Sequence, residues 1–186
     1  MKCIYILPIG SVDRKILRFV SQKVTLRLNH RCKTLRNIEE PSYAFESKRK
    51  QYSSIRILKE ILNQERSSSV AKNVIKMLGI VNVDLCTPIL TFVFGEAQLG
   101  GKAAIISLCR LRQEYYGLSP NPVLLLERTA KEALHELGHT FGLTHCSNPK
   151  CVMYFSNSVR NIDMKTDNLC SSCSILLSEK RQSLIR

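Results

Sequence analysis

The stretch His135–Cys146 reads HELGHTFGLTHC and contains the strongest motif of the chain. It holds His135, His139 and His145, three of the four histidines among 186 residues. Residues four apart on a helix project from one face about one turn apart, so His135 and His139 can bind a single Zn²⁺ at about 2.0–2.1 Å. The spacing therefore predicts a metal centre whose first two ligands lie on a helix.

Glu136 and Gly142 complete this motif. Glu136 follows the first histidine, where a general base beside a metal-bound water is expected. Gly142 lets the helix end in a sharp turn, after which His145 returns as a third ligand. Three protein ligands leave one coordination position for water, as in a catalytic zinc site. A packed or solvated histidine is the usual interpretation of a single His, but here five defined positions match HExxHxxGxxH.

Four of the eight cysteines follow in two close pairs, Cys146 with Cys151 and Cys170 with Cys173. Four thiolates in this pattern favour a closed structural zinc site, with Zn–S distances of about 2.3 Å. Disulfides or free thiols are the alternative, but no secretory signal supports an oxidising compartment. The sequence thus predicts two zinc ions per chain, one catalytic and one structural.

The net charge of +13 lies largely in residues 12–72. A basic surface can bind nucleic acid or other acidic partners. We favour a solvated outer face of helices, because the charges follow amphipathic patterns and are not clustered with aromatic residues. Nucleic acid is therefore not the expected partner, although the charge does not exclude it. No run of residues reaches the roughly 18 apolar positions that span a bilayer, so we expect a cytoplasmic protein without membrane association.

The hydrophobic pattern predicts one domain of strands and helices, since 44% of the residues are hydrophobic and can bury a core. Residues 3–10 are expected to form a buried strand, and Ser11 to cap the following helix. That helix would bury Ile16, Phe19, Val20, Val24 and Leu28. Residues 30–44 are expected to form a loop, and residues 50–63 a helix that buries Ile55, Ile57, Leu58, Ile61 and Leu62.

Further along the chain, strands are predicted at 78–86, 89–95 and 102–111, with GEAQLGG as a turn between the last two. Asn121 can cap a helix with Pro122 at its first position, and this helix would end near Gly142. Residues 143–186 are expected to be loop-like, with a short helix near the end. The remaining strand cysteines, Cys3, Cys86 and Cys109, are expected to be buried free thiols.

The C-terminal motifs resemble those of the archaemetzincins, a family of metzincin-clan zinc peptidases. In that family HExxHxxGxxH is followed at once by Cys, then by four residues, CxM and a distal CxxC. The same order occurs here as HELGHTFGLTHC, SNPK, CVM and CSSC. RKQYSS and LGGKAAIISLCRL are also similar to family sequences, so the resemblance spans nearly the whole chain.

The resemblance implies an α+β, metzincin-like fold: a twisted, mostly parallel sheet of about five strands with an active-site helix. Residues 1–142 would form an upper subdomain, and residues 143–186 a small lower one with the Met-turn and the four-cysteine zinc. Met153 falls at the Met-turn position and would pack beneath the catalytic zinc. If KAAIISLCRL is the edge strand above the cleft, substrate would bind by adding a strand to it. Tyr154 directly follows Met153, one position too early for an extra zinc ligand, and is expected to pack.

The predicted function is zinc-dependent hydrolysis of peptide bonds by a single-domain monomer. His135, His139 and His145 would hold the ion that activates water, and Glu136 would act as general base. The alternative is a catalytically weak, zinc-stabilised protein that binds peptides or nucleic acid. The presence of Glu136 in this chain argues against that alternative, because a protein that only binds peptides does not require a general base.

Overall fold

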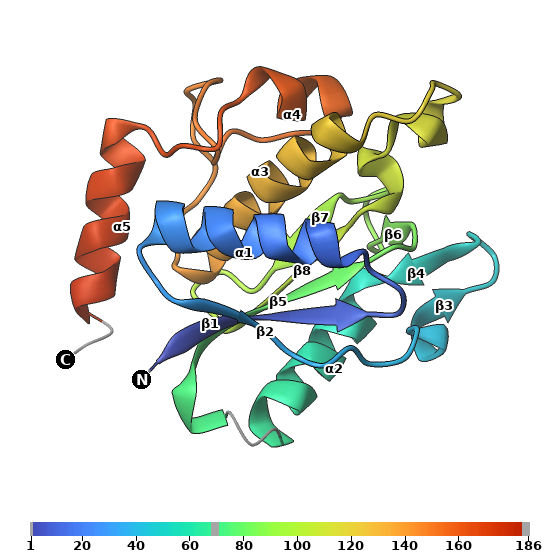
Figure 1. Ribbon diagram of the computed structural model, residues 1–186, viewed down its shortest axis with the longest axis horizontal. Helices are drawn as coiled ribbons and strands as arrows, with labels where there is room; N and C mark the ends of the chain where they lie inside the picture. The colour runs from blue at the N-terminus through green and yellow to red at the C-terminus, as the bar shows by residue number, and fades with distance from the viewer. Residues whose placement is uncertain (1, 68–70, 184–186) are drawn as a thin grey trace.

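The computed structural model describes residues 2–67 and 71–183, which form a twisted sheet with helices on both faces (Figure 1). In chain order the strands and helices are β1 (Cys3–Ile9), α1 (Arg14–Leu28), β2 (Cys32–Thr34), β3 (Phe45–Glu46), β4 (Gln51–Ser53), α2 (Ser54–Ser67), β5 (Val74–Val81), β6 (Leu85–Cys86), β7 (Gly95–Ala97), β8 (Ala103–Ser107), α3 (Pro122–Thr140), α4 (Val159–Met164) and α5 (Ser171–Ser183). Short 3₁₀ turns cover Ser42–Ala44, Ala71–Asn73, Cys109–Leu111 and Gln113–Tyr116.

The main sheet has five strands in the order β2-β1-β5-β8-β7. The pairs β2–β1, β1–β5 and β5–β8 are parallel, and only the edge strand β7 runs antiparallel to its neighbour β8. A second, small sheet has the order β3-β4-β6. The mostly parallel sheet of five strands confirms the predicted α+β fold.

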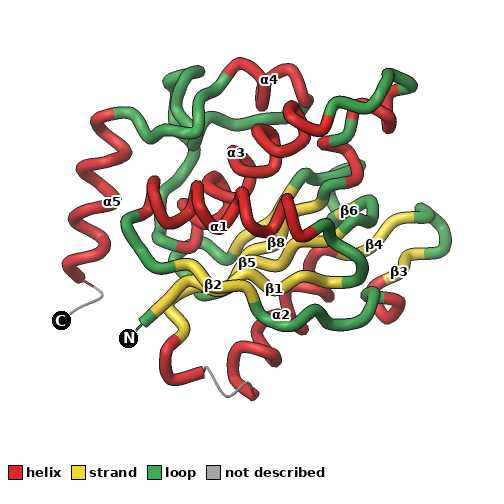
Figure 2. Tube along the Cα trace, in the orientation of Figure 1, coloured by secondary structure: helices red, strands yellow, loops and turns green. Residues whose placement is uncertain are grey.

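Both faces of the main sheet are buried, as the nearly continuous apolar run of β1 predicts. Ile4 and Ile6 pack with residues of α1 and α3, whereas Tyr5 and Leu7 pack with residues of α2 on the opposite face. The tube view shows the same layers, with α1 and α3 on one side of the strands and α2 on the other (Figure 2). A fully buried isoleucine contributes about 1.5–3 kcal/mol, so this strand anchors both layers.

Helix α3 starts and stops where its sequence signals predict. The side chain of Asn121 caps it by accepting a hydrogen bond from the Leu124 N–H at 3.0 Å, and Pro122 occupies its first position. The chain leaves the helix at Gly142, whose φ of +87° is a left-handed conformation that favours glycine. The chain therefore reverses direction directly after the last turn of α3.

Two predictions for the N-terminal half were wrong. The cap of α1 is Asp13, whose Oδ1 accepts a hydrogen bond from the Lys15 N–H at 2.7 Å, and not Ser11. The predicted loop 30–44 contains β2, which adds to the sheet beside β1. Three residues are too few to produce a periodic pattern, so β2 exists through pairing with a strand more than twenty residues away.

The predicted strand 89–95 is also wrong, since most of that segment is irregular. Side chains donate hydrogen bonds to carbonyls of this segment and of Thr87 just before it: Arg49 donates to Thr87 O, Leu90 O and Thr91 O, and Gln51 donates to Thr91 O. The edge strand β7 instead begins at Gly95 and lies inside the predicted turn. Consequently β8, which KAAIISLCRL forms, is an inner strand and not the edge strand that the resemblance suggested.

Smaller corrections concern element boundaries. Helix α2 begins at Ser54 because residues 51–53 form β4, and this places Ile55 on the outside with 45% of its surface exposed. Phe19 and Leu62 are only half-buried. Helix α4 lies within the predicted C-terminal loop, and α5 begins at Ser171. Cys109 lies in a 3₁₀ turn and is half-buried, whereas Cys3 and Cys86 are buried in strands as expected.

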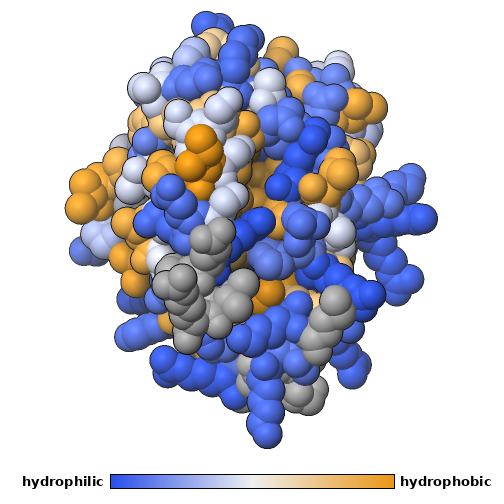
Figure 3. All heavy atoms as spheres, turned by 90° about the vertical axis from the view of Figure 1, so that its left-hand side faces the viewer, coloured by the Kyte–Doolittle hydropathy of each residue, from blue (hydrophilic) through white to orange (hydrophobic). Residues whose placement is uncertain are grey.

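Hydrophilic side chains dominate the face of the molecule that α5 covers, with hydrophobic atoms in scattered groups (Figure 3). Within the described part of the chain, no helix combines the length and apolar character needed to cross a membrane.

Candidate active site

Helix α3 and the turn after it bring the three histidines together. His135 and His139 occupy the last part of α3, with their Nε2 atoms 3.2 Å apart. His145 returns beyond Gly142, and its ring centroid lies 5.3 Å from that of His135 and 4.9 Å from that of His139. One ligand atom from each ring lies within 4.8 Å of the others, so the three can surround a single metal ion.

Backbone carbonyls fix which nitrogen of the two helical histidines faces the centre. His135 Nδ1 lies 2.9 Å from Val152 O, and His139 Nδ1 lies 2.7 Å from Leu143 O. A carbonyl only accepts, so each Nδ1 must carry the proton and donate it, which leaves the Nε2 lone pair free. Burial lowers the pKa of His135, His139 and His145, which keeps the rings neutral. These donors fit a zinc ion.

Glu136 lies against the edge strand and is only 6% exposed. A Cβ atom on Gly95 would come within 2.6 Å of Glu136 Cγ and within 2.7 Å of Ile105 O. Only glycine leaves room for this approach between α3 and β7. Burial, followed by the nearby Glu132 carboxylate, raises the pKa of Glu136 well above its ordinary value. The sequence did not predict this role of Gly95, because a glycine after an apolar run was the only pattern that pointed to it.

A buried ion pair lies one turn before the histidines. Lys165 Nζ is 2.8 Å from Glu132 Oε1, and the two side chains are 0% and 3% exposed. The same ammonium group donates to Tyr154 O at 3.4 Å. Removing one partner of a buried pair leaves an uncompensated charge, which typically costs about 3–5 kcal/mol. This pair therefore ties α3 to the segments before and after α4, and no motif in the sequence indicated it.

Met153 is fully buried next to the histidine-bearing turn of α3. Its sulfur fills the space that a side chain on Gly138 would need, since a Cβ there would lie 2.4 Å from Met153 Sδ. Tyr154 is half-buried, and its backbone pairs with that of Cys146. The Phe155 ring packs edge-on against the His145 ring, with centroids 5.0 Å apart.

The four predicted cysteines also come together. One sulfur from each of Cys146, Cys151, Cys170 and Cys173 lies within 4.8 Å of the others, and none forms a disulfide. The sulfur atoms of Cys146 and Cys170 lie 3.7 Å apart. The backbone N–H of Cys173 lowers the pKa of Cys170 to about 7, which favours a thiolate. The four clustered sulfurs could hold a second metal ion.

The two clusters share a short stretch of backbone. Cys146 directly follows His145, and its N–H donates to Met153 O at 2.9 Å. Val152 accepts from His135 through its carbonyl and donates through its N–H to Asn168 O at 2.8 Å. Atoms adjacent to the cysteines thus orient residues of the histidine cluster.

A cleft of about 650 Å³ opens in front of the histidines and Glu136. Edge strand β7 and the segment before it form one wall, and the loop after Met153 forms another. Glu96 belongs to the wall that β7 forms, and its carboxylate accepts a hydrogen bond from Ser54 Oγ. The remaining lining is largely apolar and includes Leu90, Phe92, Val93, Phe94, Ala97 and Phe155.

Comparison with known proteins identifies relatives along almost the whole chain. A family model described as peptidase family M54 matches residues 11–179. The archaemetzincin of Methanocaldococcus jannaschii is 44% identical over 170 residues, which cover 91% of this chain and 89% of the relative. The archaemetzincin of Pyrococcus abyssi is 41% identical over 178 residues and covers 93% of both chains.

Solved structures agree with these sequence matches. The crystal structure of archaemetzincin from Methanopyrus kandleri has a TM-score of 0.82 at 33% identity, covering 97% of this chain and 96% of that one. A zinc-dependent peptidase from Methanocorpusculum labreanum has a TM-score of 0.85 at 28% identity, covering 94% and 99%. The predicted resemblance is confirmed: the chain belongs to peptidase family M54 with the archaemetzincins, and it is a zinc-dependent peptidase.

Proposed function

We propose that His135, His139 and His145 hold the catalytic zinc and that Glu136 is the general base for peptide-bond hydrolysis. The observation that carries this assignment is the convergence of three neutral imidazoles, two of them with Nε2 freed by a carbonyl at Nδ1. Glu136 is adjacent to His135 and borders the same cleft. A zinc ion held there supplies Lewis acidity, polarising the scissile carbonyl and lowering the pKa of a bound water toward about 7.

The chain's own part in the reaction is the transfer of a proton. The Glu136 carboxylate takes a proton from the attacking water and delivers it to the nitrogen of the leaving amine as the C–N bond breaks. Burial and the Glu132 charge raise the pKa of Glu136, so its carboxyl group can retain the proton between the two steps.

A second zinc ion, bound by Cys146, Cys151, Cys170 and Cys173, is part of this proposal. Four sulfurs in one cluster form a closed site with no position for substrate, which suits a structural ion. Two ions per chain are then expected. Gly142 would turn the chain so that His145 can reach the catalytic ion, and Met153 would support the histidines by packing.

Peptide substrates are proposed to lie extended along β7. This strand pairs with β8 on one side only, and its Glu96 and Ala97 border the cleft. An extended peptide can add to such an edge through main-chain hydrogen bonds, while pockets along the cleft select side chains. The apolar lining favours apolar side chains next to the scissile bond.

We further propose one peptidase domain, with residues 1–142 as upper and 143–186 as lower subdomain, acting as a cytoplasmic monomer. None of the eight cysteines forms a disulfide, which suits a reducing compartment. Both metal clusters are built entirely from one chain. Sedimentation velocity tests the monomer directly, and a dimer at micromolar concentration would contradict it.

The test of the proposed function is a peptide library incubated with protein that has been stripped of metal and then reconstituted with zinc. Mass spectrometry should detect new peptide termini with the reconstituted protein and none with the stripped protein. Library members with apolar residues beside the cut should be enriched among the products. An intact library after full zinc reconstitution would favour the alternative of a binding protein without useful turnover.

A further inference from the structure

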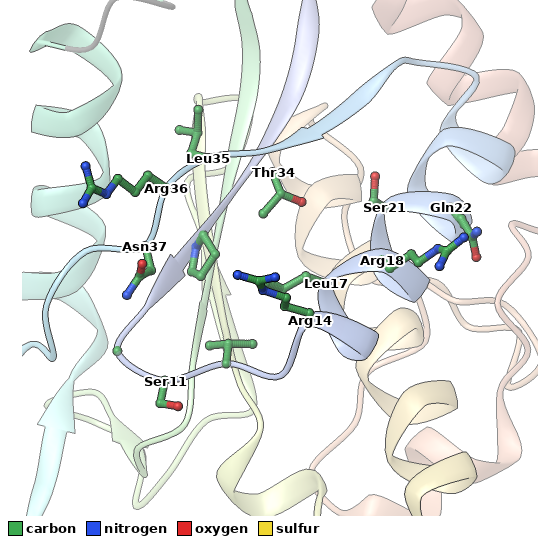
Figure 4. A pocket seen from close by; sticks show the side chains of 13 residues that line it. Ser11, Arg14, Leu17, Arg18, Ser21, Gln22, Thr34, Leu35, Arg36 and Asn37 are labelled. Carbon is green, nitrogen blue, oxygen red and sulfur yellow. The ribbon is translucent and has the colours of Figure 1, made fainter.

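A second groove, of about 830 Å³, lies at the opposite end of the chain from the catalytic motif. It is bounded by the turn after β1, the first half of α1, the last residue of β2 and residues 35–37, and it shares no lining residue with the catalytic cleft (Figure 4). The groove lies outside the carboxyl ends of β1 and β2.

An irregularity in strand pairing opens the groove. Thr34 pairs with Ile6, whereas Ile38 pairs with Ile9, so the outer chain contains one residue more than β1 over this stretch. Hydrogen bonds close the stretch at both ends, from Leu35 N to Ile6 O and from Ile38 N to Pro8 O. An extra residue makes a strand bend away from its neighbour, and such bulges commonly occur beside functional sites.

The lining combines three arginines with neutral residues and no acidic side chain. Arg14 extends between the two walls, whereas the side chains of Arg18 and Arg36 extend away from it in opposite directions (Figure 4). Neutral hydrogen-bonding side chains come from Ser11, Ser21, Gln22, Thr34 and Asn37. Apolar surface comes from Pro8, Val12, Leu17 and Leu35. The volume falls within the range of about 300–1,000 Å³ typical of small-molecule sites.

The three groove arginines have no ion-pair partner in the described part of the chain. The molecule pairs arginines elsewhere: Arg27 with Asp167 at 2.9 Å and Arg110 with Asp84 at 2.6 Å. No carboxylate lies within 4.0 Å of the guanidinium of Arg14, Arg18 or Arg36 among residues 2–67 and 71–183. Their charge is therefore available to a ligand.

The start of α1 places two like charges close together. Arg14 and Arg18 are four residues apart on one helix face, where like charges repel. The first turn contains no acidic residue, and the capping Asp13 carboxylate, which complements the helix dipole, is the one acidic group at this end of α1. Glu40 approaches Gly10 at the side, but it does not line the groove. A bound anion would offset this repulsion.

We propose that this groove binds a nucleoside di- or triphosphate. Guanidinium groups match phosphate oxygens with two parallel hydrogen bonds, and Arg14 inside the groove together with the exposed Arg18 and Arg36 at its two rims suits several phosphates better than one. The apolar surface and the neutral polar side chains provide contacts for a base and a sugar. This site is separate from the peptidase centre, and it gives a role to part of the positive charge in residues 12–72 that hydrolysis does not use.

The experiment is a titration of the zinc-loaded protein with ATP, tripolyphosphate, adenosine and citrate, by isothermal calorimetry with magnesium in excess. Magnesium keeps the phosphates from removing zinc. We expect saturable one-to-one binding of ATP, weaker binding of tripolyphosphate, and no measurable binding of adenosine. Citrate bound as tightly as ATP would overturn the proposal, because it would show a general response to negative charge.

Variants locate the site. The double variant Arg14→Gln/Arg36→Gln should weaken ATP binding at least about tenfold, since it removes two charge-assisted contacts. The control Arg31→Gln/Lys33→Gln removes the same charge from exposed neighbours that do not line the groove, and it should change the ATP affinity less than about twofold. Equal losses in both double variants, or a single-stranded oligonucleotide that binds much more tightly than ATP, would overturn the proposal. Peptidase turnover should be unchanged in both.

Discussion

Gly95 shows how much one carbon atom can matter at the active site. A Cβ at this position would meet both Glu136 Cγ and Ile105 O at 2.7 Å or less. Ile105 belongs to an inner strand and cannot move easily, so Gly95→Ala should displace the Glu136 carboxylate. We expect peptide turnover to fall about 10²-fold or more with zinc content unchanged, and stability to fall by about 1–3 kcal/mol. Steady-state kinetics with metal analysis tests this, and wild-type turnover would contradict it.

The buried Lys76 should make the stability of the fold depend on pH. It is 3% exposed and donates to Gly101 O at 2.7 Å and to Thr140 O, at the end of α3, at 2.6 Å. Burial, followed by the neighbouring Lys102 charge, lowers the pKa of Lys76 to about 8. In the unfolded chain a lysine keeps its proton up to about pH 10.4. Between these values the unfolded state binds more protons, so the contribution of Lys76 to stability rises with pH.

The measurement is urea unfolding of the wild type and of Lys76→Met between pH 7 and 10. The free energy of unfolding of the wild type, minus that of the variant, should be flat near pH 7 and rise from pH 8 to pH 10. Other titrating groups cancel in this difference. A difference that falls over the same interval would show that the two carbonyls hold the ammonium charge more strongly than burial opposes it.

At the scale of residues, the sequence predicted what a motif encodes locally. Both clusters come together as expected. The three histidines lie within eleven positions, whereas the two close cysteine pairs meet across the segment that contains α4. Gly95, Glu132 and Lys165 were not predicted. Their roles depend on contacts between segments that are distant along the chain. No local sequence pattern around these three residues predicts such contacts.

At the scale of elements, the cleft wall depends on one arginine outside it. Arg49 donates to Thr87 O at 2.7 Å, to Leu90 O at 2.7 Å and to Thr91 O at 2.8 Å. These bonds replace the ladder that a regular strand would have made. Arg49→Met should therefore loosen the wall, raising KM for peptides about tenfold while kcat changes little, because no catalytic group moves.

Two measurements check the role of Arg49. Hydrogen exchange at the amides of residues 87–91 should accelerate in Arg49→Met, together with the rise in KM. Arg56→Met is the matched control, since Arg56 contacts Glu46 and Tyr43 O and nothing in the wall. A kcat loss without a change in KM, or equal effects of the two variants, would contradict a positioning role.

The elements that were predicted correctly are those with strong local signals. Helix α3 has a capping asparagine, a proline at its first position and a terminal glycine, and β1 is a long apolar run. In contrast, β2 and β7 have three residues each and gain their structure from pairing with β1 and β8. Within the apolar segment 89–95, residues 90–94 line the cleft, and only Gly95 belongs to a strand of the main sheet.

At the scale of the whole molecule, the cysteine cluster should support the catalytic centre. His145 has no regular secondary structure to hold it and is followed at once by Cys146, whose N–H donates to Met153 O. The Val152 carbonyl that orients His135 belongs to the residue after Cys151. Cys170→Ser should therefore lower zinc affinity at the histidine site by about tenfold, comparable to the loss of other supporting contacts around metals.

Competitive zinc titration of Cys170→Ser against a chelator measures this coupling, with circular dichroism to verify that the main sheet remains folded. The variant leaves the three histidines and Glu136 unchanged, so any loss of affinity at that site must be transmitted through the backbone. An empty cysteine site combined with wild-type affinity at the histidine site would show that the two centres are independent.

The most direct test of the catalytic assignment is the turnover of Glu136→Gln on a peptide cleaved by the wild type, with zinc content measured on the same samples. The substitution keeps the size of the side chain and removes only its ability to accept a proton. We expect both zinc ions to remain bound and kcat/KM to fall by about 10²–10⁴, the usual contribution of a general base. Turnover within a few-fold of the wild type, at full zinc content, would contradict the role of Glu136 as the base.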